Sequence, residues 1–395
     1  MKRKTLLFCL LFAGIGTVQA DSSVLVFQNP DRNPVSTPLP VETLRASVPV
    51  PEPAATSSAI TPASAAPTRR GPLVTIPPTL PDAKSTAQAR TDFPEVWSAL
   101  EAMAKTQSNS EPPPLVDCQV DTNSISKIID QRLHPCTSFR GNQQLAQVLR
   151  YPWRTIGKLF MHMPDDPPEE WYEGSAQIVS TTGKQTLVAT AAHNIWDAGE
   201  KKLADQIRFV PAYRDGVAAY GQYEFDQAFI LKAYIDAPDA ARYDVALLTL
   251  KPNSAKREAA SYTGTLGLRW NVPYIMSITQ IGYSASPSSE FTTNSIGQTF
   301  RKEFRGDNCR PYPGEEVLFS GSALVQGASG GAWIDSFRPY YDKNGNYVVS
   351  VVHGGAGCGS STNIDKINTG AQFADDNIGE LCEVAGCANP ANPKR

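Results

Sequence analysis

From Tyr151 onward the sequence is a succession of short segments rich in Val, Ile, Leu, Thr and Tyr, separated by residues typical of turns. Eight such segments can be recognised, namely IGKLFMHM, SAQIVS, TLVATAAH, IRFVPAY, DVALLTL, YIMSITQIG, SALVQG and YVVSVVH. No long helical pattern separates them, and strands at this spacing favour an all-β sandwich or barrel. We therefore predict an all-β domain over residues 151–395, with a short helix near residues 372–383.

The first part of the chain has a different composition. Residues 21–88 are rich in Pro, Ala, Ser and Thr and show neither helical nor alternating periodicity. Such a composition buries too little apolar surface to offset chain entropy, so we predict a disordered linker or pro-region over 21–89. Helical spacing then predicts a small helical pro-segment or adaptor over 90–150, with one helix after Asp92 and a second at about residues 124–133.

The first 20 residues have the pattern of a secretory signal peptide. Basic residues at positions 2–4 precede an apolar run, and Val18, Gln19 and Ala20 form a small-residue cleavage site. An uncleaved membrane anchor is the alternative, but the run is shorter than the roughly 18–20 residues that span a bilayer. We expect cleavage after Ala20, a secreted or periplasmic protein, and no transmembrane segment.

Six cysteines remain once the leader is removed. An even number in an exported chain predicts disulfides, and local spacing favours three pairs out of 15 possible pairings: Cys118–Cys136, Cys309–Cys358 and Cys382–Cys387. Paired CxxC motifs and clustered histidines are both missing, so we expect no metal site and no cofactor. With 36 Lys and Arg against 39 Asp and Glu, the charge balance also gives no reason to expect nucleic acid as a partner.

Three segments of the β-rich region carry residues with complementary chemistry. His193 follows an apolar strand in TAAHN, Asp244 opens an apolar strand in YDVALL, and Ser329 lies in the glycine-rich GASGG. A serine hydroxyl becomes a useful nucleophile when an imidazole takes its proton, and a buried carboxylate holds that imidazole in the required tautomer. We predict that Ser329 attacks a carbonyl, His193 acts as base and then acid, and Asp244 orients His193.

The glycines around Ser329 have a physical role of their own. They permit a tight turn that exposes the serine and directs backbone N–H groups, those of Gly327 and Ser329, at a developing oxyanion. Each element alone is more often structural: a serine in a glycine turn, a histidine after a strand, or an aspartate at a strand end. Their coincidence in one exported β-rich domain favours catalysis.

Together, TAAH, DVALL and GxSGG resemble the signature segments of trypsin/chymotrypsin-like serine endopeptidases over about residues 150–385. The resemblance implies two six-stranded antiparallel β-barrels of the chymotrypsin type, with the site between them and a polypeptide as substrate. Because the residue next to His193 is Asn194 and not a cysteine, the chain is most similar to the bacterial glutamyl-endopeptidase-like branch. The run Arg154-Thr155-Ile156-Gly157 also resembles the activation junction of that family.

Several positions depart from the family pattern. Ala328 stands where trypsin-like enzymes have the aspartate that captures the new N-terminus, and Ala323 stands where a trypsin-type pocket has an aspartate. His353, with Gly354 and Gly355, resembles the pocket strand of glutamate-selective relatives, although a structural role for His353 is the alternative. Ser350 is the candidate for the serine that often bonds the catalytic aspartate in this family.

The sequence thus predicts a secreted serine endopeptidase that is made as a precursor and uses Ser329, His193 and Asp244. Two other functions remain open. One is a catalytically silent binding protein on a protease scaffold. The other is an envelope-attached adaptor that retains its Pro-rich arm.

Overall fold

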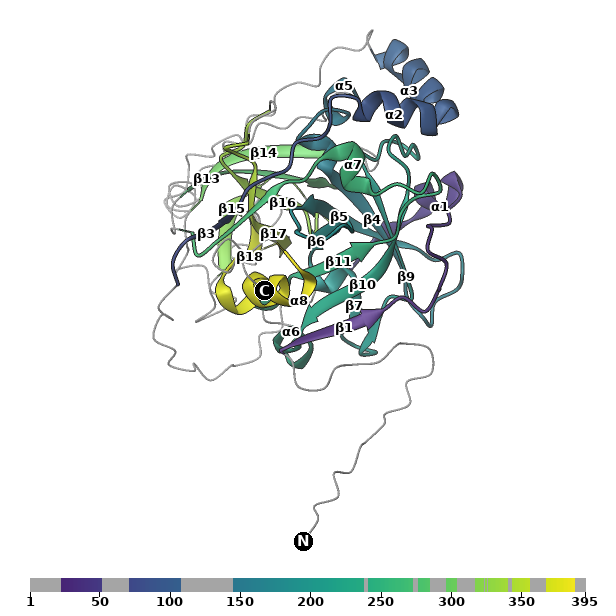
Figure 1. The fold of residues 1–395 in the computed structure, drawn as a ribbon. Helices are drawn as coiled ribbons and strands as arrows, with labels where there is room; N and C mark the ends of the chain where they lie inside the picture. Colours follow the sequence, from purple (N-terminus) through teal and green to yellow (C-terminus); the bar gives the residue numbers. More distant parts are fainter. Residues whose placement is uncertain are drawn as a thin grey trace, which may run out of the picture.

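The computed structural model of the chain describes residues 23–51, 71–107, 145–237, 241–272, 276–284, 296–303, 317–322, 324, 326–339, 343–355 and 367–387. These residues form two β-sheets of eight strands each, with a few short helices around them (Figure 1). The predicted all-β class is therefore confirmed. In the described part of the chain, no helix is long and apolar enough to cross a membrane.

The first half of the domain is a closed six-stranded antiparallel barrel. Its strands follow the order β10, β11, β6, β5, β4 and β9, and β9 pairs again with β10 to close the ring. Almost every residue of these strands is buried, because side chains fill the interior and other segments cover much of the outside. The bounds are β4 (Ile156–His162), β5 (Tyr172–Val179), β6 (Leu187–Thr190), β9 (Gln206–Pro211), β10 (Tyr223–Leu231) and β11 (Ala246–Leu250).

The second half corresponds to the second six-stranded barrel expected, and in the described residues it forms a half-barrel. Six strands follow the order β14, β13, β16, β17, β18 and β15, and β12 (Gly267–Trp270) adds to β17 in parallel. Strands β14 and β15 lie near each other, but no hydrogen-bonded ladder joins them among the described residues, so this barrel stays half formed. The bounds are β13 (Met276–Tyr283), β14 (Ile296–Glu303), β15 (Val317–Gly321), β16 (Ala332–Asp335), β17 (Tyr347–Gly355) and β18 (Ile367–Gln372).

Short elements complete the domain around these sheets. They include the hairpin of β7 and β8 after His193 and several single turns of helix. Their bounds are α5 (Leu145–Val148), η1 (Trp153–Thr155), η2 (Ala192–Asn194), β7 (Trp196–Asp197), β8 (Lys202–Leu203), α6 (Lys232–Asp236), η3 (Ala241–Tyr243) and α7 (Ala259–Thr263).

Residues 23–51 and 71–107, called the N-terminal arm below, wrap around both halves (Figure 1). Strand β1 (Val24–Gln28) pairs with β10, β2 (Val48–Pro49) pairs with β5, and β3 (Val74–Ile76) pairs with β12. Three helices lie between and after these strands: α1 (Val41–Ala46), α2 (Ser85–Asp92) and α3 (Pro94–Gln107).

The expectation of a disordered segment is therefore wrong for 23–51 and 71–89. The arm needs no core of its own, because it buries Val24, Leu44 and Ile76 against the barrels. The second helix expected, at 124–133, lies outside the described residues.

The arm also supplies hydrogen-bond partners to buried charges of the first barrel. The guanidinium of Arg154, which is 1% exposed, donates to the hydroxyls of Ser85 and Thr86 at 2.9 Å each. The carboxylate of Glu173, in an ion pair with Lys158, accepts a hydrogen bond of 2.6 Å from Ser47. Without these arm residues the two charged groups would lose partners in a setting where unpaired polar atoms are costly.

The same contacts enclose residues 154–157, which resemble an activation junction. Arg154 is enclosed by hydrogen bonds, and Ile156 is fully buried at the start of β4, whose ladders to β5 and β9 close the barrel. Cleavage after Arg154 would separate β4 from the segment before it. The new chain end would lie inside a formed sheet, where it has no freedom to move.

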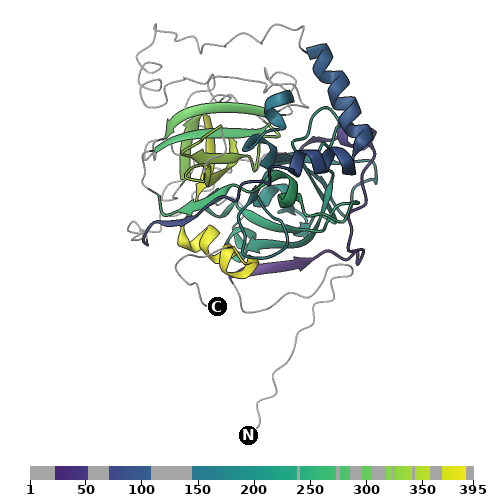
Figure 2. The ribbon, with the colours of Figure 1, turned by 45° about the horizontal axis from the view of Figure 1, so that its top comes forward.

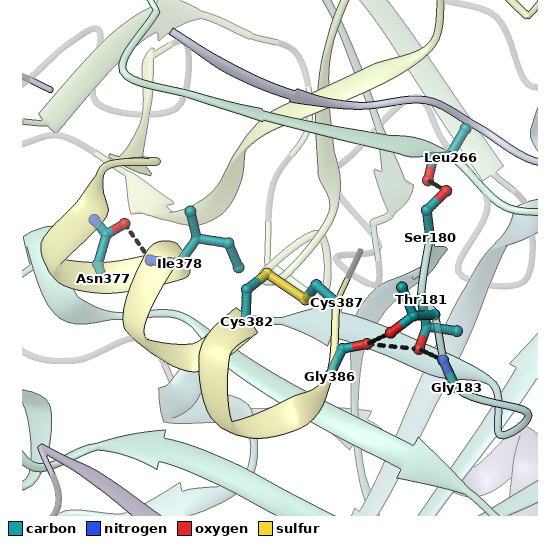
Figure 3. The surroundings of a disulfide bond; sticks show 10 residues. Ser180, Thr181, Gly183, Leu266, Asn377, Ile378, Cys382, Gly386 and Cys387 are labelled. Carbon is teal, nitrogen blue, oxygen red and sulfur yellow. Dashed lines mark hydrogen bonds between the residues drawn. A yellow bond between two sulfur atoms is a disulfide. The ribbon is translucent and has the colours of Figure 1, made fainter. Parts of the chain in front are cut away.

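The C-terminal segment forms a turn, η5 (Asp375–Gly379), and the short helix α8 (Glu380–Ala385), as expected. Figure 2 shows α8 beside β1 and β10. The predicted Cys382–Cys387 disulfide is confirmed, with a Cα–Cα distance of 4.7 Å, and Figure 3 shows its surroundings. There the carbonyl of Gly386 accepts hydrogen bonds from the hydroxyls of Thr181 and Thr182, so this loop is fastened to the β5–β6 connection. The other two cysteine pairs lie outside the described residues.

Candidate active site

Strand pairing brings His193 and Asp244 together. In the antiparallel pair of β6 and β11, Thr190 lies opposite Ala246. His193 follows Thr190 by three residues, in η2, and Asp244 precedes Ala246 by two, so both reach the same end of the barrel. The apolar strands predicted from TLVA and VALLTL thus place the imidazole and the carboxylate side by side.

Asp244 accepts two hydrogen bonds from His193. Its Oδ1 accepts from the backbone N–H of His193 at 2.9 Å, and its Oδ2 accepts from Nδ1 at 2.7 Å. An ionised carboxylate only accepts, so Nδ1 carries the proton and Nε2 is left as the basic nitrogen. Nε2 is buried and has no hydrogen-bond partner among the described residues, which leaves it available to take a proton.

The carboxyl of Asp244 is held as an anion although it is fully buried. Burial works to raise its pKa. Attraction to His193 and His353 and the hydrogen bonds from both rings outweigh burial and hold the pKa of Asp244 well below its ordinary value. A carboxylate in this state stabilises an imidazolium on His193, as an orienting aspartate must.

Ser329 lies in the tight turn that precedes β16. Gly327 and Gly330 have φ values of +86° and +81°, which only glycine adopts without strain. The carbonyls of the turn already have donors, since Gly327 O accepts from the Ser175 hydroxyl, Ala328 O from Gly331 N–H, and Ser329 O from Ser175 N–H. In the described residues the N–H groups of Gly327 and Ser329 have no acceptor, so both remain available for an oxyanion.

The side chain of Ser329 is buried and does not yet contact the base. Its hydroxyl makes one long hydrogen bond, of 3.5 Å, to the carbonyl oxygen of His353. No hydrogen bond joins it to His193 in the part of the chain that the structure describes. In proteins without bound substrate such catalytic hydrogen bonds are often long and tighten only in the complex.

His353, expected on the pocket strand, contacts the aspartate instead. Its Nδ1 lies 2.5 Å from Oδ2 of Asp244, and its ring stands perpendicular to the ring of His193, with centroids 5.8 Å apart. Ser350, the residue considered for this role, donates to Val351 O. His353 is placed beside Asp244 by a hydrogen bond from Gly330 N–H to Val352 O, which joins the Ser329 turn to β17. The sequence carries no signal for this long-range pairing.

The remaining expected substrate residues are only partly visible. Gly354 and Gly355 extend β17 and pair with Thr369 and Asn368 of β18. Ala323 lies outside the described residues. The three members His193, Asp244 and His353 also form a group whose ligand atoms lie within 4.8 Å of one another, a spacing that a metal ion could use. Each Nδ1 already bonds Asp244, so the carboxylate is satisfied by the two rings themselves.

The turn around Ser329 gives one prediction for stability and activity together. A Cβ at Gly330 would lie 2.2 Å from Ser175 O and 2.3 Å from Thr190 Oγ1, at a φ of +81°. We expect Gly330→Ala to lower the free energy of unfolding by about 3–5 kcal/mol and to abolish hydrolysis. Gly386→Ala is the matched control, because its φ of +79° is similar and no atom lies within 4 Å of the added carbon. It should cost about 1–2 kcal/mol in urea unfolding. Equal losses in both variants would contradict the crowding described here.

No protein-family model matches this chain, and no curated protein matches it. Several solved structures are similar in fold. The protease Anisep from Arthrobacter nicotinovorans is 23% identical, over 59% of this chain and 95% of its own, with a TM-score of 0.49. A thermostable serine protease, AL20, from an extremophilic microorganism is 18% identical over 58% and 96%, with a TM-score of 0.48. A Glu endopeptidase is 14% identical over 64% and 98%, with a TM-score of 0.47.

With identities below 25% and TM-scores below 0.5, these similarities concern the fold alone. The described residues form a mostly β fold that contains a closed six-stranded barrel. A fold of this class is what the resemblance of TAAH, DVALL and GxSGG implies.

Proposed function

We propose that this protein is an exported serine endopeptidase, made as a precursor, that hydrolyses peptide bonds through an acyl-enzyme on Ser329. The observation that supports it best is the pairing of His193 Nδ1 with buried Asp244, while Nε2 of His193 has no hydrogen-bond partner among the described residues. No group among the described residues bonds this nitrogen, which suits a general base that takes the proton of the Ser329 hydroxyl during the reaction.

The chemistry follows from these groups. As a substrate carbonyl enters, the Ser329 hydroxyl turns from His353 O to His193, Nε2 takes its proton, and a bond forms between Oγ and the carbonyl carbon. The N–H groups of Gly327 and Ser329 stabilise the oxyanion. His193 then gives the proton to the leaving amine as the C–N bond breaks, and a water molecule hydrolyses the ester by the reverse sequence.

Side-chain preference at the scissile bond is a separate question. With its Nδ1 committed to Asp244, His353 cannot offer that nitrogen to a substrate carboxylate, which weakens the motif-based expectation of glutamate selectivity. Ala328 cannot capture a new N-terminus, so precursor processing, if it precedes activity, works differently from the trypsin-like ion pair. N-terminal sequencing of secreted material tests the precursor form. An N-terminus at Asp21 supports a retained arm, and one beyond residue 107 supports removal.

The test of the proposed function is covalent labelling of the wild-type protein with a fluorophosphonate, followed by mass spectrometry of its peptides. We expect one adduct per chain, on the peptide that contains Ser329, and cleavage of a mixed peptide library that the same reagent blocks. A folded protein that takes up no label and cleaves no peptide would favour the silent binding protein. Label on another serine would overturn the assignment of the nucleophile.

A further inference from the structure

Asn194 connects the catalytic histidine of the first barrel to the nucleophile turn of the second half. It directly follows His193 in η2 and is fully buried. Its side-chain Nδ2 donates to the backbone carbonyl of Ser329 at 2.9 Å and to the hydroxyl of Thr190 at 3.0 Å. Asn194 is thus bonded in the chain to the proposed base, His193, and hydrogen-bonded to the backbone of the proposed nucleophile, Ser329.

The orientation of the Asn194 amide follows from its partners. The carbonyl of Ser329 can only accept a hydrogen bond, and the Thr190 hydroxyl already donates its proton to the carbonyl of Ser175 at 2.9 Å. Both atoms thus require a donor, so the NH₂ group faces them. The other amide atom, Oδ1, is buried and has no partner among the described residues. A buried acceptor left unpaired is unfavourable, so the contribution of Asn194 at this position lies in the hydrogen bonds that its NH₂ group donates.

These hydrogen bonds form a closed ring. The N–H of Ser175 donates to Ser329 O at 2.7 Å, and the carbonyl of Ser175 accepts from Thr190, which accepts from Asn194. Two glycines make room for the amide, since a Cβ at Gly174 or Gly330 would lie 2.8 Å or 2.7 Å from Nδ2 of Asn194. The ring thus fixes the Ser329 carbonyl from two directions.

We infer that Asn194 is a positioning residue that holds the Ser329 backbone at a set distance from His193. The inference rests on the proposed function. The amide touches neither substrate nor reacting atoms and acts through the nucleophile turn. Displacement of a reacting group by about 1 Å can cost about 10²-fold in rate, so the ring matters for the chemical step more than for substrate binding.

The experiment compares Asn194→Ala and Asn194→Asp with the wild type. Asn194→Asp has the same shape but presents only oxygen atoms to Ser329 O. We expect kcat per fluorophosphonate-labelled site to fall by about 10²-fold in both variants with KM changed less than about threefold.

Asn253→Ala is the matched control. Asn253 is also buried, and its amide donates to the Tyr223 hydroxyl and accepts from loop N–H groups after β11. This control should lose stability with kcat per labelled site unchanged.

A second variant keeps the inference testable if Asn194→Ala does not fold. Thr190→Val preserves the side-chain shape and removes one member of the ring. We expect about a tenfold loss of kcat, and a combined effect with Asn194→Asp that is smaller than the product of the two. If Thr190→Val or a folded Asn194→Ala has the same kcat as the wild type, the inference about Asn194 is wrong, and the proposed function is unaffected. A wild-type protein that neither labels nor cleaves would overturn the proposed function, and this inference with it.

Discussion

Replacing Ser329 by alanine is expected to lower kcat for peptide hydrolysis by about 10⁶-fold while the protein stays folded. The loss is large because the hydroxyl is the atom that would form the covalent bond, and no neighbouring group can replace it. The fold should be spared, since the one hydrogen bond that this hydroxyl makes to a described residue is the long contact to His353 O. Steady-state cleavage of a fluorogenic peptide and far-UV circular dichroism measure the two parts of the result.

Ser350→Ala is the matched control for this substitution. Ser350 is a fully buried serine on β17, and among the described residues its hydroxyl bonds the neighbouring Val351 carbonyl alone. We expect its kcat to stay within a few-fold of wild type. Activity retained by a Ser329→Ala preparation after repeated purification would contradict the assignment of the nucleophile, whatever the outcome at Ser350.

Asp244→Asn is expected to lower kcat by about 10⁴-fold with little change of shape. An asparagine amide placed among the backbone N–H of His193 and two ring N–H groups cannot accept from all three, because one of its two polar atoms is itself a donor. His193 would then carry its proton on Nε2 and could not act as a base. The matched control is Asp205→Asn, since Oδ1 of Asp205 bonds Nδ1 of His162 at 2.8 Å in a partly exposed pair. It should leave kcat near that of the wild type, and equal losses would show that any broken Asp–His pair inactivates the protein.

The contribution of Asp244 to the stability of the wild type depends on pH. The pKa of Asp244 is lower in the folded protein than in the unfolded chain, where an aspartate titrates at about 3.9. Its contribution to the free energy of unfolding is therefore fully present above about pH 4 and is lost as the pH falls toward the folded-state pKa. Urea unfolding of the wild type and Asp244→Asn should show a difference in the free energy of unfolding that shrinks as the pH falls below about 4.

The sequence could predict those features that are local. Alternating and apolar segments located most strands of the first barrel, and the tight glycine turn and the residues before and after apolar strands located His193, Asp244 and Ser329. The pair Cys382–Cys387 was accessible because only a short loop separates the two residues. Each of these depends on neighbours within a few positions in the chain.

Features that depend on distant partners could not be predicted. The contact of His353 with Asp244 depends on how β17 lies beside the Ser329 turn, and the role of Asn194 depends on a carbonyl 135 positions later. The arm was missed because composition measures whether a segment can form a core of its own. It does not measure whether the segment can pack against the core of another part of the chain, as Val24 and Ile76 do.

The pairing of the arm also sets an order in time. Val24 pairs with Leu231 and Val74 pairs with Trp270, so the earliest parts of the chain to be synthesised wait for partners made much later. Contacts of such long sequence separation form slowly, because the intervening loop must close before any bond repays the entropy. The first strand of the protein is therefore among the last to find its place, and a chain interrupted before Leu231 leaves β1 without the strand that it pairs with.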